Sequence, residues 1–311
     1  MQYVGELISL GVAFSWTITA LASEVGSRRL GVVVLNVWRL GLAMICSALM
    51  IWLFTGVPYP IYAGTETWMW LLLSGVVGYF FGDWCLFNSY MCFGSRYGQL
   101  FMTLAPMFAA ISAWIALGQT LGWNSLLAMI VTLTGIGISV LGRGEHHSLS
   151  LQLPLKGVIY AIGAALGQGV GLVLSKIGLD HYTADVPATS LSDMEHILPF
   201  SANMIRCLSG TVCFLLWMSI SGNLHQLQQS VHERKGMLAM YITVFFGPFL
   251  GVGFSLMAVQ YTAAGIASTI MALSPILIIV PSYYLFHQKI STRGVIGAII
   301  SIIGVSLFFL L

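Results

Sequence analysis

Charged residues are scarce in this sequence. Only 7% of its 311 residues are Asp, Glu, Lys or Arg, and 58% are hydrophobic, whereas a soluble domain carries roughly 25% charged residues. Such a chain cannot cover itself with polar surface, so lipid must surround most of it. The formal net charge of +2 is too small and too scattered to indicate a nucleic-acid partner. The composition therefore predicts an integral membrane protein.

Several chemical signatures are missing too. The five cysteines lie inside apolar stretches, and their spacing fits neither a disulfide framework nor a metal site. No phosphate-binding loop is present, so we expect no ATP-driven step on this chain. We therefore predict no metal and no cofactor. The N-terminal residues lack the positive region of a signal peptide, and the first apolar stretch should remain as a transmembrane segment.

Long apolar runs are abundant. A bilayer core needs about 20 apolar residues of helix, whereas strands of a membrane barrel alternate over about 10 residues, and these runs do not alternate. We predict an all-α integral membrane protein with ten transmembrane helices. They cover approximately residues 4–22, 32–54, 68–91, 98–117, 123–141, 157–178, 200–219, 237–259, 264–286 and 293–310.

The sequence also repeats. Pro106 pairs with Pro275 at an offset of 169 residues, without a gap over about 60 residues. Five helices are an odd number, so the second repeat enters the membrane from the opposite side, a plan that recurs in secondary transporters. We expect one repeat in 1–141, a joining loop in 142–156 and an inverted repeat in 157–311. The same offset pairs Gly78 with Gly247, Gly82 with Gly251, Leu104 with Leu273 and Gly135 with Gly304.

Small residues recur on the predicted first and sixth helices. Gly163, Gly167 and Gly171 are spaced four apart, and Gly11, Ser15 and Thr19 occupy the matching positions in the first half. Small residues at this spacing let helix backbones approach closely in lipid. We expect tight helix packing here, with room for a ligand beside Gln168 as the alternative.

The duplicated motifs resemble those of the EamA family of the drug/metabolite transporter superfamily. The matching stretches are NVWR and NMIR, GVVGYFFGDW and GPFLGVGF, LAP and LSP, and LTGIGISVLG and IIGVSLF. The resemblance implies a transporter of small metabolites or drugs, commonly an exporter, with a central cavity between the repeats. The acidic residue that often follows the fourth helix in this family is glutamine in both halves here, Gln119 and Gln288.

Lysine and arginine gather on one side of the predicted membrane. Nine of the twelve lie in loops that follow odd-numbered helices. Short cytoplasmic loops collect these residues, so both termini should lie outside the cytoplasm. We expect the protein in a bacterial inner (plasma) membrane.

Asp83 is the leading candidate for a functional residue. It lies about 15 residues into the third predicted helix, roughly 22 Å from its start. A carboxylate at this depth is costly, and such residues commonly face a cavity, pair with a cation or relay protons. Its counterpart Val252 is apolar, so the repeat itself does not require a carboxylate. We predict Asp83 on the substrate or proton path; the alternative is a structural carboxyl that fixes helix contacts.

Other polar and aromatic residues could complete a small-molecule pocket, which is largely apolar with a few converging polar groups. Packing against helices or lipid is the alternative for each of them. The candidates are Trp16, Trp84, Asn88, Tyr90 and Gln168.

Four residues form a duplicated Asn-x-x-Arg motif: Asn36 and Arg39 in the second helix, Asn203 and Arg206 in the seventh. Each arginine is about 10 Å deep, within reach of a guanidinium that extends to the headgroups. We favour a structural anchor, with gating salt bridges or anion binding as the alternative. Glu24 and Lys176 also occupy equivalent positions with opposite charge, and could pair across the axis that relates the repeats.

Pro106 and Pro275 interrupt the fourth and ninth predicted helices. A proline inside a helix costs about 3 kcal/mol in water, and membrane helices tolerate it where neighbours satisfy the freed carbonyl. Interruptions at corresponding positions of two halves point to a transporter's binding site. We predict that both prolines mark cavity-facing bends; inherited helix curvature is the alternative.

The leading hypothesis is a secondary active transporter that works by alternating access on a small-molecule substrate. We expect it to be surrounded by membrane lipid and to be a monomer or a homodimer. The proton is the candidate coupling ion. A lipid flippase or a non-transporting membrane subunit stays open as an alternative. An intramembrane enzyme is disfavoured, because an aspartyl protease needs two deep carboxylates and only Asp83 qualifies.

Overall fold

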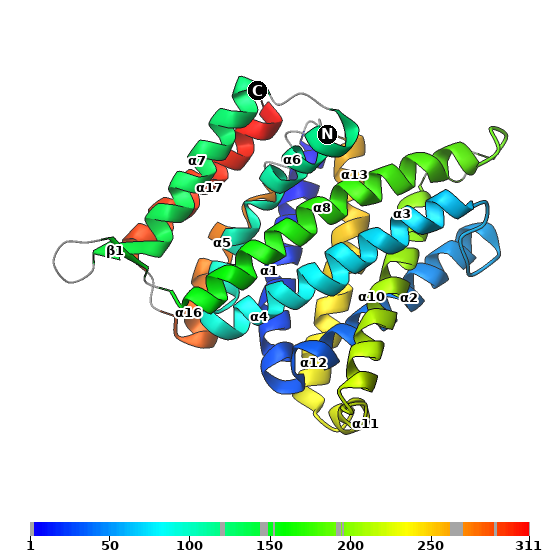
Figure 1. Cartoon of the computed structure of the whole chain (residues 1–311), viewed down its shortest axis with the longest axis horizontal. Helices are drawn as coiled ribbons and strands as arrows, with labels where there is room; N and C mark the ends of the chain where they lie inside the picture. The colour runs from blue at the N-terminus through cyan, green and yellow to red at the C-terminus, as the bar shows by residue number, and fades with distance from the viewer. Residues whose placement is uncertain are drawn as a thin grey trace.

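The chain folds into a bundle of helices (Figure 1). This computed structural model describes residues 3–118, 122–143, 149–151, 153–190, 194, 196–261, 270–288 and 291–310. The predicted helical class is confirmed. By length and composition, seven of the described helical segments could cross a membrane, and two shorter apolar ones are Ser274–Phe286 and Thr292–Leu307. The seven are Val4–Leu30, Val32–Thr55, Thr65–Phe93, Ser95–Leu117, Trp123–Val140, Leu155–Asp185 and Leu198–Ile220.

The first half contains sharp glycine turns and a π-helical segment. Gly31 and Gly94 adopt φ of 84° and 89°, values that favour glycine, and they separate successive helices. The π-helical segment η1 joins α3 to α4 in one continuous rod. The elements are α1 (Val4–Leu30), α2 (Val32–Thr55), α3 (Thr65–Gly75), η1 (Val76–Gly82), α4 (Asp83–Phe93), α5 (Ser95–Met102), α6 (Ala105–Leu117) and α7 (Trp123–Val140).

The second half contains a matching π-helical segment, η3, between α12 and α13. Its elements are α8 (Leu155–Asp185), α10 (Leu198–Ile220), α11 (His225–Ser230), α12 (Arg234–Val244), η3 (Phe245–Gly251), α13 (Val252–Tyr261), α15 (Ser274–Leu277), α16 (Ile279–Phe286) and α17 (Thr292–Leu310). Between the halves, β1 (Leu141–Arg143) pairs antiparallel with β2 (Leu149–Leu151). This short ladder replaces part of the loop expected at 142–156; residues 144–148 and 152 lie outside the described residues.

Two helices extend well beyond their predicted ends. α1 continues past residue 22 to Leu30, and α8 continues past residue 178 to Asp185. Polar residues in these last turns are paired along the helix: Arg28 with Glu24, and Lys176 with Asp180. The prediction placed the ends too early because hydropathy falls there, whereas pairs four residues apart support a helix. Glu24 and Lys176, which could have paired with each other, each form an ion pair with a residue of their own helix instead.

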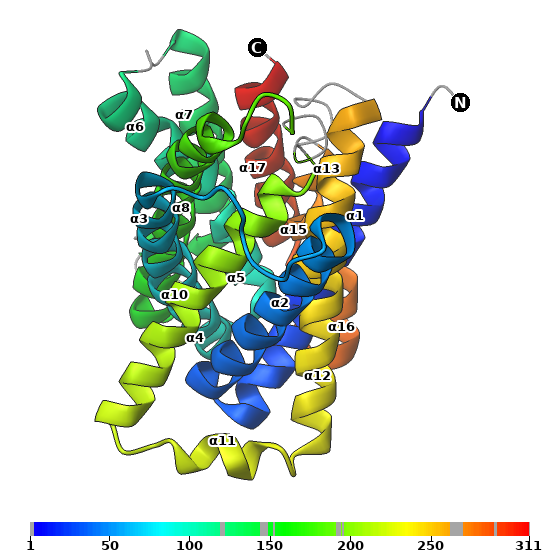
Figure 2. The ribbon, with the colours of Figure 1, turned by 90° about the vertical axis from the view of Figure 1, so that its right-hand side faces the viewer.

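The helices pack as two groups, with a cavity between them. α8 packs against α3, η1, α4 and α6, while α1 packs against α12, η3 and α13. α2 lies along α10, and α7 lies along α17 at the edge that carries the β1–β2 ladder (Figures 1 and 2). We call α8 with α3, η1, α4, α5 and α6 the α8 group, and α1 with α12, η3 and α13 the α1 group.

The predicted close packing of small residues occurs between α8 and η1. A Cβ added to Gly167 or Gly171 would come within 2.7 or 2.9 Å of a glycine Cα in η1. Between α7 and α17, the Ser301 hydroxyl donates to the Thr132 carbonyl at 3.4 Å. Gly11 differs, because nothing lies within 4 Å of a Cβ added there.

Candidate functional site

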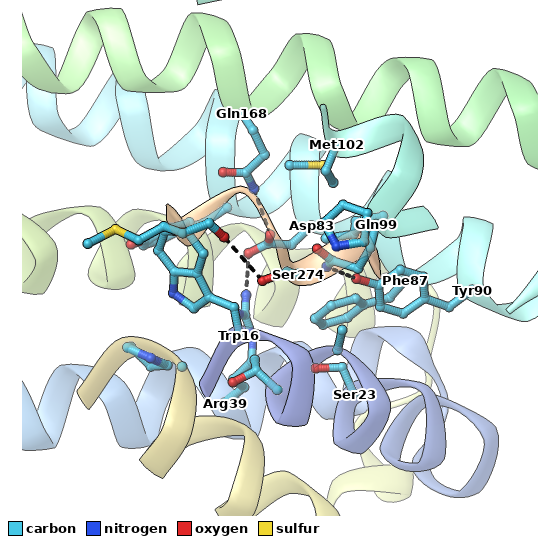
Figure 3. Close-up of a pocket in the computed structure, with 18 of the residues that line it drawn as sticks. Trp16, Ser23, Arg39, Asp83, Phe87, Tyr90, Gln99, Met102, Gln168 and Ser274 are labelled. Atoms are coloured by element: carbon cyan, nitrogen blue, oxygen red, sulfur yellow. Dashed lines mark hydrogen bonds and ion pairs between the residues drawn. The ribbon is translucent and has the colours of Figure 1, made fainter. Parts of the chain in front are cut away.

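A cavity of about 520 Å³ lies among the helices and receives side chains from both halves. Most of its wall is apolar, with a few converging polar groups (Figure 3). The polar members on the first half are Thr19, Ser23, Arg39, Tyr79, Asp83, Tyr90, Gln99 and Thr103, and those on the second half are Gln168, Cys207 and Ser274. This composition suits a small organic molecule.

A buried ion pair forms the polar centre of the cavity. The Arg39 guanidinium donates to one carboxylate oxygen of Asp83, and their side chains are 11% and 6% exposed. Gln168 Nε2 donates to the other oxygen, Asp83 Oδ1, at 2.7 Å. Figure 3 shows Arg39 and Gln168 reaching Asp83 from opposite sides. Asp83 thus accepts from two donors, as an ionised carboxylate does.

The π-helical segment η1 positions this carboxylate. Asp83 follows Gly82 directly, and Gln168 Nε2 also donates to the Gly78 carbonyl at 3.1 Å. π-helical turns leave irregular carbonyls, and they are frequent at functional sites. The amide of Gln168 therefore fixes both the backbone of η1 and the carboxylate that η1 presents.

Arg39 corrects one of our interpretations. We favoured an anchor at the lipid headgroups, but the side chain points inward, to Asp83, to Asn36 Oδ1 at 3.2 Å and to the Phe87 ring, whose centroid is 5.1 Å from Cζ. A buried carboxylate offers stronger electrostatic attraction than hydrated headgroups. Asn36 is fully buried and supports the arginine.

Arg206 lies over an aromatic ring instead of a carboxylate. Its Cζ is 4.3 Å from the centroid of Tyr79, whose hydroxyl donates to Asn203 Oδ1. Asn203 Nδ2 in turn donates to Ser47 Oγ at 3.2 Å. The duplicated Asn-x-x-Arg motif therefore serves two arrangements, an ion pair in the first half and a stacked cation in the second.

Both prolines line the cavity at breaks in their helices. The helix interrupted at Thr103 and Leu104 resumes as α6, with Pro106 in its first turn. In the second half α15 begins at Ser274, and Pro275 occupies the same place. Ser274 Oγ donates to the Ala13 carbonyl at 3.0 Å, which ties this break to α1. Each break thus lies at the cavity wall, at corresponding positions of the two halves.

The remaining predicted residues divide between the cavity and its surroundings. Trp16, Tyr90 and Gln168 line it. Trp84 does not line the cavity. The centroid of its ring lies 5.4 Å from that of Tyr160 and 5.8 Å from that of Trp217. Asn88 also lies away from the lining and donates to the Trp84 carbonyl within α4.

The sequence interpretation missed several lining residues. Leu86 and Phe87 share the cavity face of α4 with Asp83 and Tyr90, and Gln99 Nε2 donates to the Tyr90 hydroxyl at 2.8 Å. Positions three, four and seven residues from Asp83 lie on one helix face, so periodicity counted from the carboxylate would have found them. Within the described residues no cluster of three His, Cys, Asp or Glu could hold a metal.

Comparisons with known proteins agree with this architecture. The sequence profile of the EamA-like transporter family matches residues 3–141 and again residues 155–310. The search of curated proteins finds no match. One matching solved structure, described only as "Crystal structure of protein", is 16% identical, with a TM-score of 0.57 over 100% of this chain and 98% of that chain. At this identity the likeness shows the fold alone.

Proposed function

We propose, on the premise that this chain belongs to the EamA-like transporter family of the drug/metabolite transporter superfamily, that it is a secondary transporter of a small metabolite or drug. In this proposal ten helices span the membrane as two inverted repeats, 1–141 and 157–311, joined by 142–156. The two family matches and the paired π-helical segments η1 and η3 support the repeat. A transporter family also agrees with a role other than catalysis.

The observation that carries the proposal is the ion pair of Asp83 and Arg39 on the cavity wall. Buried ion pairs contribute little to stability compared with apolar residues of similar volume, and ionisable residues within membrane helices typically mark substrate or ion paths. Polar groups of a substrate would compete for the same donors and acceptors. The cavity lies between the α1 group and the α8 group, whose rocking would expose it alternately to each face.

Asp83 is also the site we propose for proton coupling. It is the acidic residue among the described residues that line the cavity. A proton on Asp83 would remove its charge and release Arg39, so proton binding and substrate binding would act on one ion pair.

We propose export as the direction, with both termini outside the cytoplasm. Labelling of a single cysteine at Tyr3 in intact bacteria with an impermeant reagent tests the sidedness, and protection would reverse it.

Substrate counterflow in proteoliposomes tests the function. Amino acids, nucleosides, sugars and cationic drugs are screened with and without a pH gradient, and wild type should exchange at least one class. Asp83→Asn should remain folded and lose proton-driven transport. The control Asp180→Asn, which alters an exposed carboxylate on α8, should transport normally.

Two outcomes would contradict the proposal. Wild-type transport by Asp83→Asn would end the role of Asp83 in coupling. Exchange of none of the four classes, together with transfer of labelled lipid between leaflets, would favour the flippase alternative.

A further inference from the structure

A fully buried carboxylate, Glu24, lies at one end of the cavity. It is 0% exposed, and its Oε2 accepts the backbone N–H of Ser95 at 2.6 Å. Its Oε1 accepts Nε and Nη2 of Arg28 at 3.1 and 2.8 Å. Glu24 therefore connects α1 to the first residue of α5. We call Glu24, Arg28 and Ser95 the Glu24 latch.

The turn at Gly94 makes this contact available. It ends α4 and starts α5, so the Ser95 N–H belongs to a first helical turn, where amide groups have no partner within the helix. A carboxylate at such a terminus makes a charge-assisted hydrogen bond that the helix dipole strengthens. Gln288 covers the corner from the second half, because a Cβ on Gly94 would overlap its amide.

The latch adjoins the cavity lining. Ser23 and Tyr90 line the cavity; Ser23 precedes Glu24 in α1, and the Tyr90 carbonyl accepts the Gly94 N–H at 2.9 Å. Glu24 and Ser95 are therefore close in sequence to residues of the cavity wall, and both are 0% exposed, so protein covers them at this end.

The latch also bridges the two helix groups. Glu24 belongs to α1, which packs mainly with α12, η3 and α13, whereas α5 packs mainly with α4 and α8 and has a smaller contact with α1. Another ion pair at this end behaves differently: Arg29 bonds Glu233 at 2.9 Å, and both side chains are 42% exposed. That pair joins α1 to the start of α12, within the α1 group. Separation of the groups would stretch the latch, and it would leave the exposed pair intact.

The equivalent place in the second half carries the opposite charge. Lys176 is 62% exposed and bonds Asp180 on its own helix at 2.9 Å. A lysine has no acceptor for a backbone N–H, so the same contact cannot form there. Position 264, which pairs with Ser95 at the offset of 169, lies outside the described residues.

We propose that Glu24 is a gating residue for one end of the cavity alone. Its bond to Ser95 holds that end closed in this conformation and breaks when the α1 and α8 groups separate there. Because Lys176 replaces the carboxylate in the other half, the latch favours the state closed at the Glu24 end. The inference rests on the alternating-access transport proposed above.

Cysteine accessibility tests the gate without knowledge of the substrate. The five native cysteines are replaced, and Thr19→Cys places one thiol on the cavity wall. Separate His232→Cys and Tyr59→Cys variants, each at an exposed loop position, identify the face at the Glu24 end and the opposite face. An impermeant maleimide is then applied to sealed vesicles of each orientation.

Glu24→Gln should raise labelling of the cavity thiol from the His232 face about tenfold, equivalent to about 1.4 kcal/mol. Arg28→Gln should raise it less, because Ser95 still donates to Glu24. Glu233→Gln is the matched control, since it removes an exposed carboxylate at the same end. Lys176→Gln is the control at the equivalent position, and both controls should label at the wild-type rate.

Wild-type labelling of a folded Glu24→Gln protein would overturn the gate, while counterflow would still report on transport. An equal rise from both faces would also overturn it, because that result indicates general loosening. If Glu24→Gln does not fold, Arg28→Gln decides, and an unchanged rate there contradicts the proposal. A one-sided rise in a protein that exchanges none of the four substrate classes and transfers labelled lipid between leaflets would support the gate and contradict the metabolite transport proposed above.

Discussion

The π-helical segments η1 and η3 occupy equivalent places in the two halves but carry different chemistry. They span Val76–Gly82 and Phe245–Gly251, positions related by the offset of 169 that also pairs the two prolines. η1 leads directly into Asp83, whereas η3 contains Pro248 and leads into Val252. The backbone irregularity therefore belongs to the shared architecture, and the charge is an addition to one half.

The two segments also differ in how they are held. η1 meets α8 backbone to backbone, through Gly78 and Gly82 against Gly171 and Gly167. η3 meets α1 through side chains. Ser15 Oγ donates to the Phe246 carbonyl at 2.6 Å, and a Cβ on Gly251 would lie 2.8 Å from Trp16 Nε1. Close backbone packing thus supports the segment that presents Asp83, as a precise polar site requires, whereas η3 contributes Gly247 and Pro248 to the cavity wall and no charge.

The largest expected effect comes from breaking the ion pair. Arg39→Met leaves Asp83 buried without its cation, so the free energy of unfolding in mixed micelles should fall by about 3–5 kcal/mol. The double variant Arg39→Met/Asp83→Leu should recover most of this loss and still fail to transport. A double variant as unstable as the single one would show that Arg39 acts through packing instead of charge.

Much of this comparison was predictable from sequence. The helical class follows from apolar runs, and the pairing of Pro106 with Pro275 follows from a constant offset. Asp83 stands out because a carboxylate at that depth needs a partner. What the sequence could not determine was that partner, since Arg39 is 44 residues away and could equally have extended to the headgroups.

Residue type alone could not tell which polar and aromatic side chains face the cavity. Trp84 and Asn88 were candidates because they are aromatic or polar within a membrane segment, but each further residue turns a helix by about 100° from Asp83. Both therefore lie on the flank of α4, where Trp84 packs on Tyr160 and Trp217. The π-helical turn of η1 also shifts the phase between α3 and α4, and no regular period carries across it.

A smaller effect is expected where η1 meets α8. Gly171→Ala places a Cβ 2.9 Å from the Gly78 Cα, and overpacking of this kind costs about 1–3 kcal/mol. Gly11→Ala is the matched control, because its Cβ would have nothing within 4 Å. Chemical unfolding of both variants in mixed micelles measures the difference. Equal stabilities would show that η1 can move away from α8 without cost.

The two equivalent arginines should differ in the same assay. Arg206→Gln removes a cation from the face of Tyr79, a contact worth about 2 kcal/mol where it is desolvated, and it leaves no carboxylate without its ion-pair partner. Its effect on unfolding should therefore be smaller than that of Arg39→Met, and counterflow should persist. A loss of transport equal to that of Asp83→Asn would place Arg206 in the same functional unit as the ion pair.

The smallest effect on stability is expected at the prolines. Pro106 and Pro275 occupy the first turns of α6 and α15, where an amide has no helical partner and proline is tolerated. The break before α6 is also held by the Leu104 N–H, which donates to the Phe101 carbonyl at 3.0 Å. Pro106→Ala and Pro275→Ala should thus change the free energy of unfolding by less than about 1 kcal/mol. Because both rings line the cavity, the KM for counterflow should change more than stability does. A loss of stability similar to that of Gly171→Ala would instead show that the proline rings themselves maintain the two breaks.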